Sequence, residues 1–249
     1  MEGDGDGRSR PGRTHDQESL MACVLVDVDG TLLGSPSTEV RFVLHLLKRR
    51  RLGWKQIFHA ATFPLRWFPR FGRHVFKKNK AYLAGLSVSD VESEGEDFIR
   101  RAVAPHLRRE ILDLIDGHMA RGDTVVLLTG TPDFIAEPLA RLLGAHGAYA
   151  TRCARQDGIY TAEPPLLHPF ADAKVVLARE ICREMLSPMT EAVAYADSIH
   201  DLPLLLQVGR AVAAWPDPAL RAIARKGNWL ILPQRSVASA AANRKASSS

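Results

Sequence analysis

A short apolar segment that ends in two carboxylates constrains the fold of this chain more than any other feature. Residues 21–31 read Met-Ala-Cys-Val-Leu-Val-Asp-Val-Asp-Gly-Thr, so Asp27 and Asp29 follow an almost wholly apolar run. Such a run predicts a buried strand, and strand side chains two residues apart point to the same side. Neighbouring carboxylates raise each other's pKa unless a metal ion uses their charge. The segment therefore predicts a strand that ends in a reactive site.

Two more ordinary explanations compete for this segment. The pair Asp29-Gly30 is typical of tight turns and, taken alone, would fit a hairpin. A calcium-binding loop has a similar alternation of acids, but it requires Gly at its sixth position and Glu at its twelfth. Leu32 and Thr38 occupy those positions here, which excludes the calcium loop. The turn stays open on this segment alone.

Three later segments carry similar boundary signals. Residues 124–132 read Thr-Val-Val-Leu-Leu-Thr-Gly-Thr-Pro, an apolar strand that ends in a hydroxyl and a glycine, with Pro at an expected helix start. Lys174 lies early in an amphipathic helix. Residues 191–203 contain a short apolar run that ends at Asp197, and Asp201 lies one turn further on if a helix begins there. Taken singly, a solvated lysine or an acidic loop is the commoner explanation.

Together, and in this order, the four segments resemble the haloacid dehalogenase superfamily of phosphoryl-transfer hydrolases. The resemblance runs from about Met21 to Leu232 and is strongest to the phosphoserine-phosphatase-like subgroup, which inserts a helical cap after the first motif. It implies a Rossmann-like α/β fold with a mainly parallel sheet. One departure is Ala196, which stands where the family usually has Gly before the metal-binding Asp. Ala would be costly there if the backbone required a positive φ.

The resemblance implies a catalytic role for each motif residue. Asp27 is the expected nucleophile, which forms an aspartyl-phosphate. Asp29 is the expected acid and base, which protonates the leaving oxygen and later deprotonates water. Thr129 and the backbone N–H of Gly130 are expected to hold phosphoryl oxygens, and Lys174 to bind substrate and neutralise charge in the transition state. An Asp at position 29 favours phosphate transfer to water or an alcohol, and hence a phosphatase.

The same resemblance implies magnesium as the cofactor. Its expected ligands are the Asp27 carboxylate, the Asp29 backbone carbonyl and Asp197, with water completing the shell. Asp201 is expected beside them, as a partner of the metal or of Lys174. The positive charge of the ion would let an anionic nucleophile approach an anionic phosphate.

The coarse organisation fits one catalytic domain with an insertion. Apolar runs that alternate with helical patterns predict a mainly parallel sheet covered on both faces, with the active site at the carboxyl ends of its strands. The runs after the first are Thr124–Thr129, Ala192–Tyr195, Ala211–Ala214 and Trp229–Leu232. The expected division is a core at 21–34 and 105–234, a helical cap at 35–104, and disordered ends at 1–20 and 235–249.

The cysteines and the apolar runs indicate the cellular compartment in which the protein is expected. Cys23, Cys153 and Cys182 show no metal-binding or redox spacing. We find no secretory signal and no apolar run long enough to cross a membrane. The sequence therefore predicts a cytoplasmic protein with reduced cysteines.

The expected cap has an unusual composition. From Arg41 to Lys80 there are twelve Lys or Arg residues, eight aromatic residues and no Asp or Glu, although the net charge of the whole chain is only +5. Pro64 and Pro69 are expected to interrupt any long helix. Short helices are therefore expected around Thr38–Leu52, Trp54–Ala61 and Arg73–Leu83.

Three interpretations of residues 41–80 stay open. The simplest is an ordinary cap with its aromatic residues inside and its basic residues solvated. The second is peripheral contact with an anionic membrane, and the third, which is the least favoured, is binding of nucleic acid.

The sequence thus predicts a magnesium-dependent phosphomonoester hydrolase, acting on a phosphorylated lipid precursor or another small phosphorylated metabolite. A phosphomutase is the alternative enzyme. A weakly catalytic scaffold that binds membranes through the cap is the alternative from another class. Phosphoserine itself is not the expected substrate, because phosphoserine phosphatases place a Glu soon after the first motif. The nearest acid here, Glu39, has a different spacing.

Overall fold

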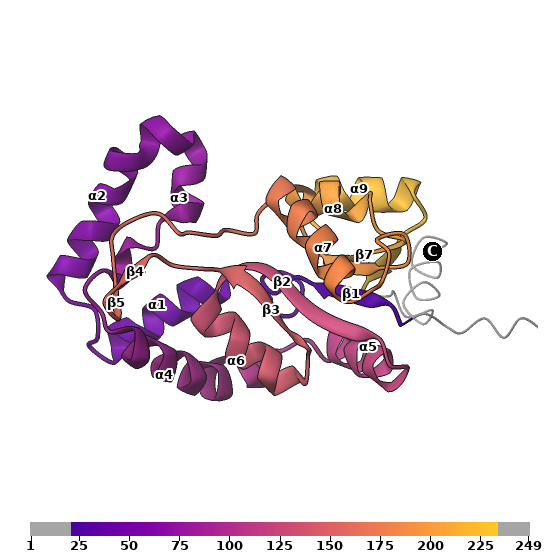
Figure 1. The fold of residues 1–249 in the computed structure, drawn as a ribbon, viewed down its shortest axis with the longest axis horizontal. Coiled ribbons are helices and arrows are strands. Elements are labelled where there is room, and N and C mark those ends of the chain that lie inside the picture. The colour runs from indigo at the N-terminus through magenta and orange to yellow at the C-terminus, as the bar shows by residue number, and fades with distance from the viewer. Residues whose placement is uncertain (1–20, 234–249) are drawn as a thin grey trace, which may run out of the picture.

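A computed structural model describes residues 21–233, so the expected disordered ends lie outside the described residues. Six strands form one parallel sheet in the order β3-β2-β1-β6-β7-β8, which confirms the predicted α/β fold (Figure 1). The strands of this sheet are β1 Cys23–Val26, β2 Thr124–Pro132, β3 Gly147–Thr151, β6 Val193–Ala196, β7 Arg210–Ala214 and β8 Leu230–Leu232. A separate antiparallel hairpin consists of β4 Arg155–Gln156 and β5 Ile159–Tyr160.

Helices occupy most of the remaining described chain. The α-helices are α1 Thr38–Lys48, α2 Trp54–Phe71, α3 Val75–Lys78, α4 Val88–Phe98, α5 Arg109–Ala120, α6 Asp133–Leu143, α7 Asp172–Glu184, α8 Leu202–Leu205 and α9 Pro218–Lys226. The 3-10 turns are η1 Gly72–His74, η2 Ala81–Leu83, η4 Ala104–His106 and η5 Ile199–Asp201, and η3 Ile99–Val103 is a π-helical turn. Among the described helices, none is long and apolar enough to span a bilayer.

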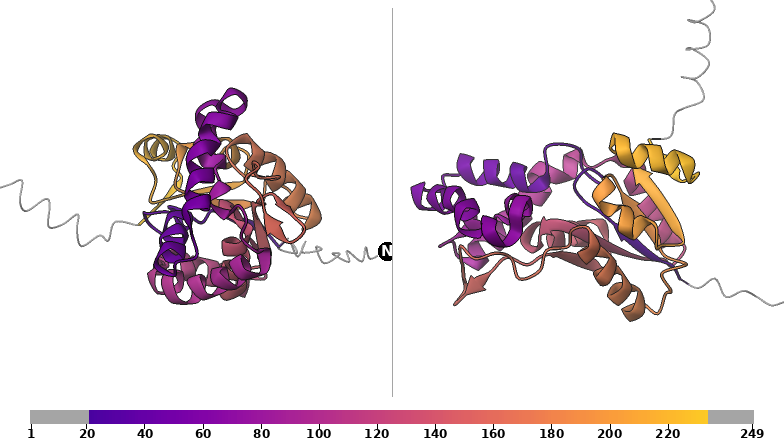
Figure 2. Two further views of the ribbon diagram at one scale, coloured as in Figure 1. Left: turned by 90° about the vertical axis from the view of Figure 1, so that its left-hand side faces the viewer. Right: turned by 90° about the horizontal axis from the view of Figure 1, so that it is seen from above.

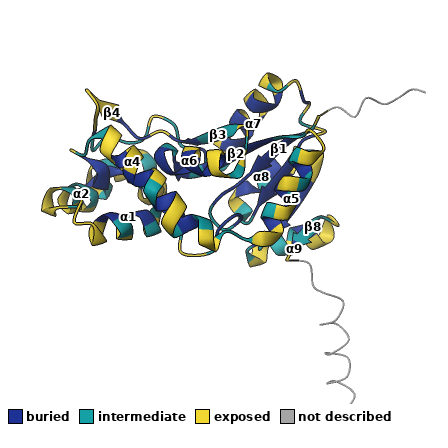
Figure 3. Cartoon of the chain, turned by 90° about the horizontal axis from the view of Figure 1, so that it is seen from below, coloured by how far each residue is buried: buried dark blue, intermediate teal, exposed yellow. Residues whose placement is uncertain are grey.

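The alternating side chains of β1 divide the hydrophobic core between the two faces of the sheet. Val24 and Val26 pack in the cluster that contains residues of α5 and α6. Cys23 and Leu25 point to the other face and pack in the cluster that contains residues of α7, α8 and α9. Every residue of β1 is therefore buried, as Figure 3 shows, and an uninterrupted apolar run is what a strand covered on both faces requires.

The strand order reverses at β1, and this position determines where the site lies. The strands that follow β1 directly in the chain lie on one side of it, and β6 with the later strands lies on the other. In open α/β sheets, ligands bind beyond the carboxyl ends of the strands at such a reversal. Asp27 follows β1 and Asp197 follows β6, so residues 170 positions apart become neighbours.

The strands expected from apolar runs all form, with boundaries close to those expected. Within the six-stranded sheet, β3 was not predicted, because Gly-Ala-Tyr-Ala-Thr is short of β-branched residues. It forms because it pairs in parallel with β2 at the edge of the sheet. Tertiary pairing thus overrides a weak local preference.

The expectation that Pro64 and Pro69 would interrupt the helix is wrong, because α2 runs through both of them. A proline lacks an N–H, so Pro64 leaves the carbonyl of Ala60 without its helical donor. The side chain of Asn79 supplies the missing hydrogen bond, with its Nδ2 2.8 Å from Ala60 O. The partner lies outside the helix, so the local sequence gave no sign of it.

The inserted helices differ in how they attach to the sheet. Helices α1 and α4 share the large core cluster with α6, and the ring of Phe42 lies 5.1 Å from that of Phe134 and 5.3 Å from that of Phe98. Helices α2 and α3 instead rest on a small cluster around Phe63 and Val75. They project from the rest of the molecule, as Figure 1 and the left view of Figure 2 show.

The hairpin formed by β4 and β5 also joins the inserted helices. The backbone N–H of Gly85 donates to Tyr160 O at 2.9 Å, and the N–H of Tyr160 donates to Leu86 O at 3.0 Å. A segment from the second half of the chain therefore supports the insertion. The division into a core and a cap at 35–104 stays a prediction.

Candidate active site

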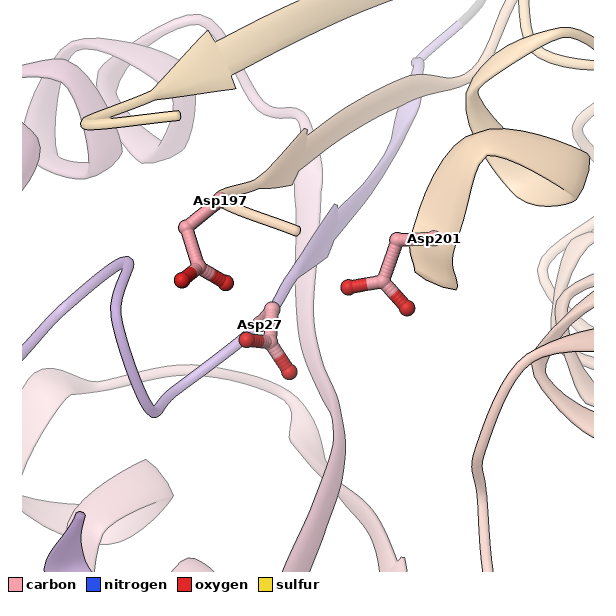
Figure 4. A group of neighbouring side chains, drawn as sticks. All are labelled: Asp27, Asp197 and Asp201. Atoms are coloured by element: carbon pink, nitrogen blue, oxygen red, sulfur yellow. The ribbon is translucent and has the colours of Figure 1, made fainter. Parts of the chain in front are cut away.

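Three carboxylates meet beyond the carboxyl ends of β1 and β6. Side-chain oxygens of Asp27, Asp197 and Asp201 lie within 4.8 Å of one another, and Figure 4 shows the three groups converging on one space. Asp201 is the last residue of the short turn η5. This turn places its side chain near that of Asp197, four residues earlier in the chain. The sequence expectation placed both later acids beside Asp27, and the structure brings them together.

Lys174 lies between two of these acids. Its Nζ donates to Asp27 Oδ1 at 2.8 Å and lies 2.9 Å from Asp201 Oδ1. Its side chain is almost fully buried in the first turn of α7. Burying an ammonium is costly unless it is paired, and here two carboxylates pair with it. The two acids raise the pKa of Lys174, so this side chain is a fixed positive charge.

The acids themselves are unusually easy to protonate. Burial raises the pKa of Asp27 to about 7, and Lys174 offsets only part of this effect. Burial, together with the charge of Asp201, raises the pKa of Asp197 to about 6. A divalent cation at this place would favour the ionised forms, because its charge interacts with the carboxylates.

Gly30 is required because Asp197 packs against it. The φ of Gly30 is +88°, and a Cβ added to it would lie 1.9 Å from Asp197 Oδ2. The carbonyl of Gly30 in turn accepts a hydrogen bond from Arg108, whose guanidinium also lies 4.0 Å from the ring centre of Trp215. Arg108 therefore holds the loop after β1, a role that the sequence did not suggest.

Asp29 points away from the acidic cluster. Its Oδ1 accepts the backbone N–H of Thr38 at 2.6 Å, and its Oδ2 accepts the hydroxyls of Thr131 at 3.0 Å and Thr38 at 3.2 Å. Thr38 begins α1, so the start of the first inserted helix orients this carboxylate. Among the four expected metal ligands, Asp29 is thus the one whose side chain lies apart. Only its backbone carbonyl stays a predicted ligand.

Thr129 and Gly130 lie near the end of β2, beside the acids. The buried hydroxyl of Thr129 donates to Thr131 Oγ1 at 3.1 Å, so it must turn to donate to a phosphoryl oxygen. The carbonyl of Gly130 accepts the hydroxyl of Thr151 at 2.6 Å. Thr131, which connects Thr129 to Asp29, was not predicted as a site residue. Its position two residues after Thr129 on a strand, and therefore on the same side, was the available signal.

Ala196 does not strain the metal-binding loop. It lies within β6, is buried, and has no positive φ. The departure from the usual Gly therefore carries no backbone cost here. The positive φ in this region belongs to Gly30, which does have the glycine that such a backbone favours.

The acidic cluster fits a magnesium ion. Carboxylate oxygens are the ligands that this hard cation prefers, and the cluster offers three carboxylates from three segments. Lys174 engages Asp27 through Oδ1 and also engages Asp201. The second oxygen of Asp27 and the carboxylate of Asp197 have no lysine partner among the described residues, so they are the oxygens available to a metal ion.

A cavity of about 330 Å³ adjoins these residues, which is the size of a site for a small metabolite. A larger hollow of about 760 Å³ around Arg210 and Trp229 contains no cluster of acids or bases and lies away from the carboxylates. Besides Thr131 and Glu39, eight residues of the smaller cavity were missed as site residues, because the fold brings them from loops, short turns and inserted helices. They are Ser37, Lys77, Lys80, His168, Pro169, Phe170, Ser198 and His200.

Glu39 also lines this cavity, although its spacing differs from that of the Glu in phosphoserine phosphatases. Its Oε2 forms an ion pair with the ammonium of Lys80, whose side chain is only 5% exposed. Glu39 is therefore near the site in spite of its different spacing, and the expectation about phosphoserine stays a prediction. The charge of Glu39 is nevertheless already matched by a lysine of this chain.

Comparisons with known proteins identify the family of this chain. The model of the haloacid dehalogenase-like hydrolase family matches residues 24–206. A phosphoserine phosphatase of Mycobacterium tuberculosis is 32% identical over 220 residues, which cover 85% of this chain and 70% of that protein. A probable phosphatase of the same organism is 36% identical over 149 residues, covering 60% of this chain and 52% of that protein.

Solved structures show the same fold. A Bordetella pertussis protein of unknown function superimposes with a TM-score of 0.70 at 29% identity, covering 85% of this chain and 98% of that one. A phosphoserine phosphatase solved as a phospho-aspartyl intermediate analogue gives a TM-score of 0.57 at 16% identity, covering 88% of this chain and 96% of that one.

Proposed function

Because this chain belongs to the haloacid dehalogenase-like hydrolase family, we propose that it cleaves small phosphomonoesters with magnesium, through an aspartyl-phosphate on Asp27. The enzyme class expected from the sequence, a phosphatase, is confirmed by its relatives. One observation carries the specific mechanism. A buried carboxylate, Asp27, is held at 2.8 Å by a buried lysine at the strand reversal, beside a cavity and a second acid at Asp197.

The proposed first step is attack of Asp27 on phosphorus. An oxygen of the carboxylate bonds to phosphorus while the bond from phosphorus to the leaving oxygen breaks. Lys174 donates to Oδ1 of Asp27 and so orients the carboxylate for attack. The departing oxygen takes a proton from Asp29, which the hydroxyls of Thr38 and Thr131 orient.

The second step hydrolyses the aspartyl-phosphate. Asp29 removes a proton from water, the water oxygen bonds to phosphorus, and the bond to Asp27 breaks to restore the carboxylate. Thr129 and the N–H of Gly130 are proposed to hold the phosphoryl oxygens in both steps, and Lys174 to offset their charge.

Asp27, Asp197 and the backbone carbonyl of Asp29 are proposed to hold the magnesium ion. When bound, the ion lowers the repulsion between an anionic nucleophile and an anionic phosphate. Asp201 is proposed to act through Lys174, with which it is paired, and not as a direct ligand.

The substrate proposed is a small phosphomonoester without an ammonium group, such as a phosphorylated lipid precursor. The pairing of Lys80 with Glu39 supports this choice, because a substrate ammonium would have to displace a buried lysine to reach the carboxylate. The cavity volume supports a small molecule.

A panel of phosphorylated metabolites and p-nitrophenyl phosphate, assayed with magnesium and with a chelator, tests the proposal. We expect magnesium-dependent release of inorganic phosphate, and trapping of a phosphorylated Asp27 by acid quenching and mass spectrometry. Absence of turnover on every ester, with magnesium present and the protein folded, contradicts the proposed function.

A further inference from the structure

Helix α2 presents an apolar face to the outside of the molecule. Four large side chains on this face are exposed: Trp54 by 72%, Phe58 by 58%, Leu65 by 80% and Phe68 by 52%. With Ile57, which is 58% exposed, they follow the spacing of three, four and seven residues that places side chains on one face of a helix. Exposed apolar residues elsewhere on a protein are usually scattered singly, whereas these form a stripe.

The opposite face of α2 already has its partners. Phe63, Trp67 and Phe71 pack in the small cluster beneath the helix, together with Val75 of α3. The outward stripe is therefore additional to what the fold uses. Within residues 21–233 no element covers it, and Figure 1 shows α2 standing at the edge of the molecule.

Positive charge flanks the stripe. Helix α2 contains no acidic residue, and Lys55, Arg70 and Arg73 form no ion pair within the part of the chain that the structure describes. Lys55 lies in the first turn of α2 and Arg73 lies just after its end. Arg70 is turned to the inner face, with its guanidinium 5.2 Å from the ring centre of Phe71. An apolar face with a basic border is the pattern of a helix that lies in the interface of an anionic bilayer.

The structure also separates these cations from others in the basic segment. Arg49 pairs with Asp97 at 2.7 Å, and Arg51 pairs with Glu94 at 3.1 Å, so both tie α1 and its following loop to α4. Arg66 pairs with Glu163. Arg49, Arg51 and Arg66 thus tie parts of the fold together, whereas Lys55 and Arg73 have no acidic partner within residues 21–233.

We propose that the outer face of α2 docks on an anionic membrane surface, with its aromatic and aliphatic side chains at the acyl boundary and Lys55 and Arg73 among the headgroups. A protein partner would need acidic residues placed opposite these cations as well as an apolar groove. An anionic bilayer supplies negative headgroups and an apolar interior everywhere on its surface. This binding site is independent of catalysis. It would hold α3, whose Lys77 lines the catalytic cavity, close to the membrane.

Sedimentation of the full-length protein with vesicles tests the proposal. Phosphatidylcholine vesicles with about one third phosphatidylglycerol are compared with pure phosphatidylcholine, at low and at moderate salt. We expect binding to the anionic vesicles only, weakened by salt, with a blue shift of tryptophan fluorescence. The variant F58S/L65S/F68S should bind at least about tenfold more weakly, because burying apolar area drives insertion. The variant K55Q/R73Q should lose the preference for anionic lipid.

A matched control is L142S/L186S/L206S, which removes three exposed leucines from other faces. This control should bind like the wild type, and all variants should keep their melting temperature. Failure of the wild type to bind anionic vesicles at low salt overturns the proposal. Equal loss of binding in the control variant overturns it too, as does self-association of the wild type through α2, shown by F58S/L65S/F68S becoming monomeric.

Discussion

The ammonium of Lys174 lies 2.8 Å from Asp27 Oδ1, although 147 positions separate the two residues in the chain. The pair is buried, so each charge depends on the other and on Asp201 for its stability. This arrangement fixes one oxygen of Asp27 and leaves the other available.

The first prediction concerns the nucleophile. Asp27→Asn should lower turnover of p-nitrophenyl phosphate by at least about a thousandfold, because the amide keeps the shape of the side chain and loses its reactive anion. Asp29→Asn should also be slow, but phosphate should accumulate on Asp27 when the leaving group needs no proton. Mass spectrometry after acid quenching distinguishes the two variants, and an active Asp27→Asn enzyme would exclude the covalent mechanism.

The second prediction concerns Gly30 and metal binding. Gly30→Ala should raise the magnesium concentration needed for half activity by about tenfold or more, because the new Cβ would lie 1.9 Å from Asp197 Oδ2. Asp197→Ala should have the same effect, or a larger one, by removing the ligand. Gly147→Ala is the matched control, since no atom lies within 4 Å of its added Cβ. A normal magnesium response in Gly30→Ala would contradict the placement of the metal at Asp197.

The third prediction concerns pH. The pKa values of Asp27 and Asp197, about 7 and about 6, lie above their ordinary value of 3.8, so the native state holds protons that the unfolded chain releases. The stability that this provides is present below about pH 4 and is lost as pH rises to about 7. The melting temperature in a chelator should therefore fall by a few degrees through this window.

Magnesium should act in the opposite direction in the same titration. It binds the ionised carboxylates, so the rise in melting temperature that it causes should be larger at about pH 8 than at about pH 5. Equal stabilisation at both pH values would show that the ion does not bind these acids.

The fourth prediction concerns substrate choice. O-phosphoserine and 3-phosphoglycerate differ by an ammonium in place of a hydroxyl, and Lys80 already occupies the carboxylate of Glu39. We expect kcat/KM to be at least about tenfold higher for 3-phosphoglycerate, which corresponds to about 1.4 kcal/mol. Lys80→Met should reduce this ratio, since it frees Glu39. Efficient hydrolysis of phosphoserine by the wild type would refute the assignment of the Glu39 and Lys80 pair.

The fifth prediction concerns α2. Asn79→Ala should lower the free energy of unfolding by about 1 to 2 kcal/mol, because the Ala60 carbonyl loses the donor that replaces the N–H missing at Pro64. Lys78→Ala, one residue away, should change it by less than about 0.5 kcal/mol. Urea unfolding measures both. A neutral Asn79→Ala variant would mean that water satisfies this carbonyl equally well.

The sequence by itself determined the parallel sheet and the segments that form its site. Buried parallel strands need continuous apolar runs, so the runs before Asp27, Thr129 and Asp197 were visible without a structure. The motif residues were visible for a related reason. Glycine, hydroxyl and carboxylate side chains directly after an apolar strand are uncommon unless a site uses them, and their order along the chain completed the resemblance.

Only the tertiary structure decided which groups touch. The edge strand β3, the path of α2 through its prolines, the pairing of Glu39 with Lys80 and the turn of Asp29 toward Thr38 all depend on partners distant in the chain. Local propensity carries no information about such partners, because a hydrogen bond or ion pair across the fold depends on where two segments meet. The same reason applies to the twelve basic residues between positions 41 and 80. Their number follows from the sequence, but only the structure shows which of them form ion pairs with acids elsewhere in the chain.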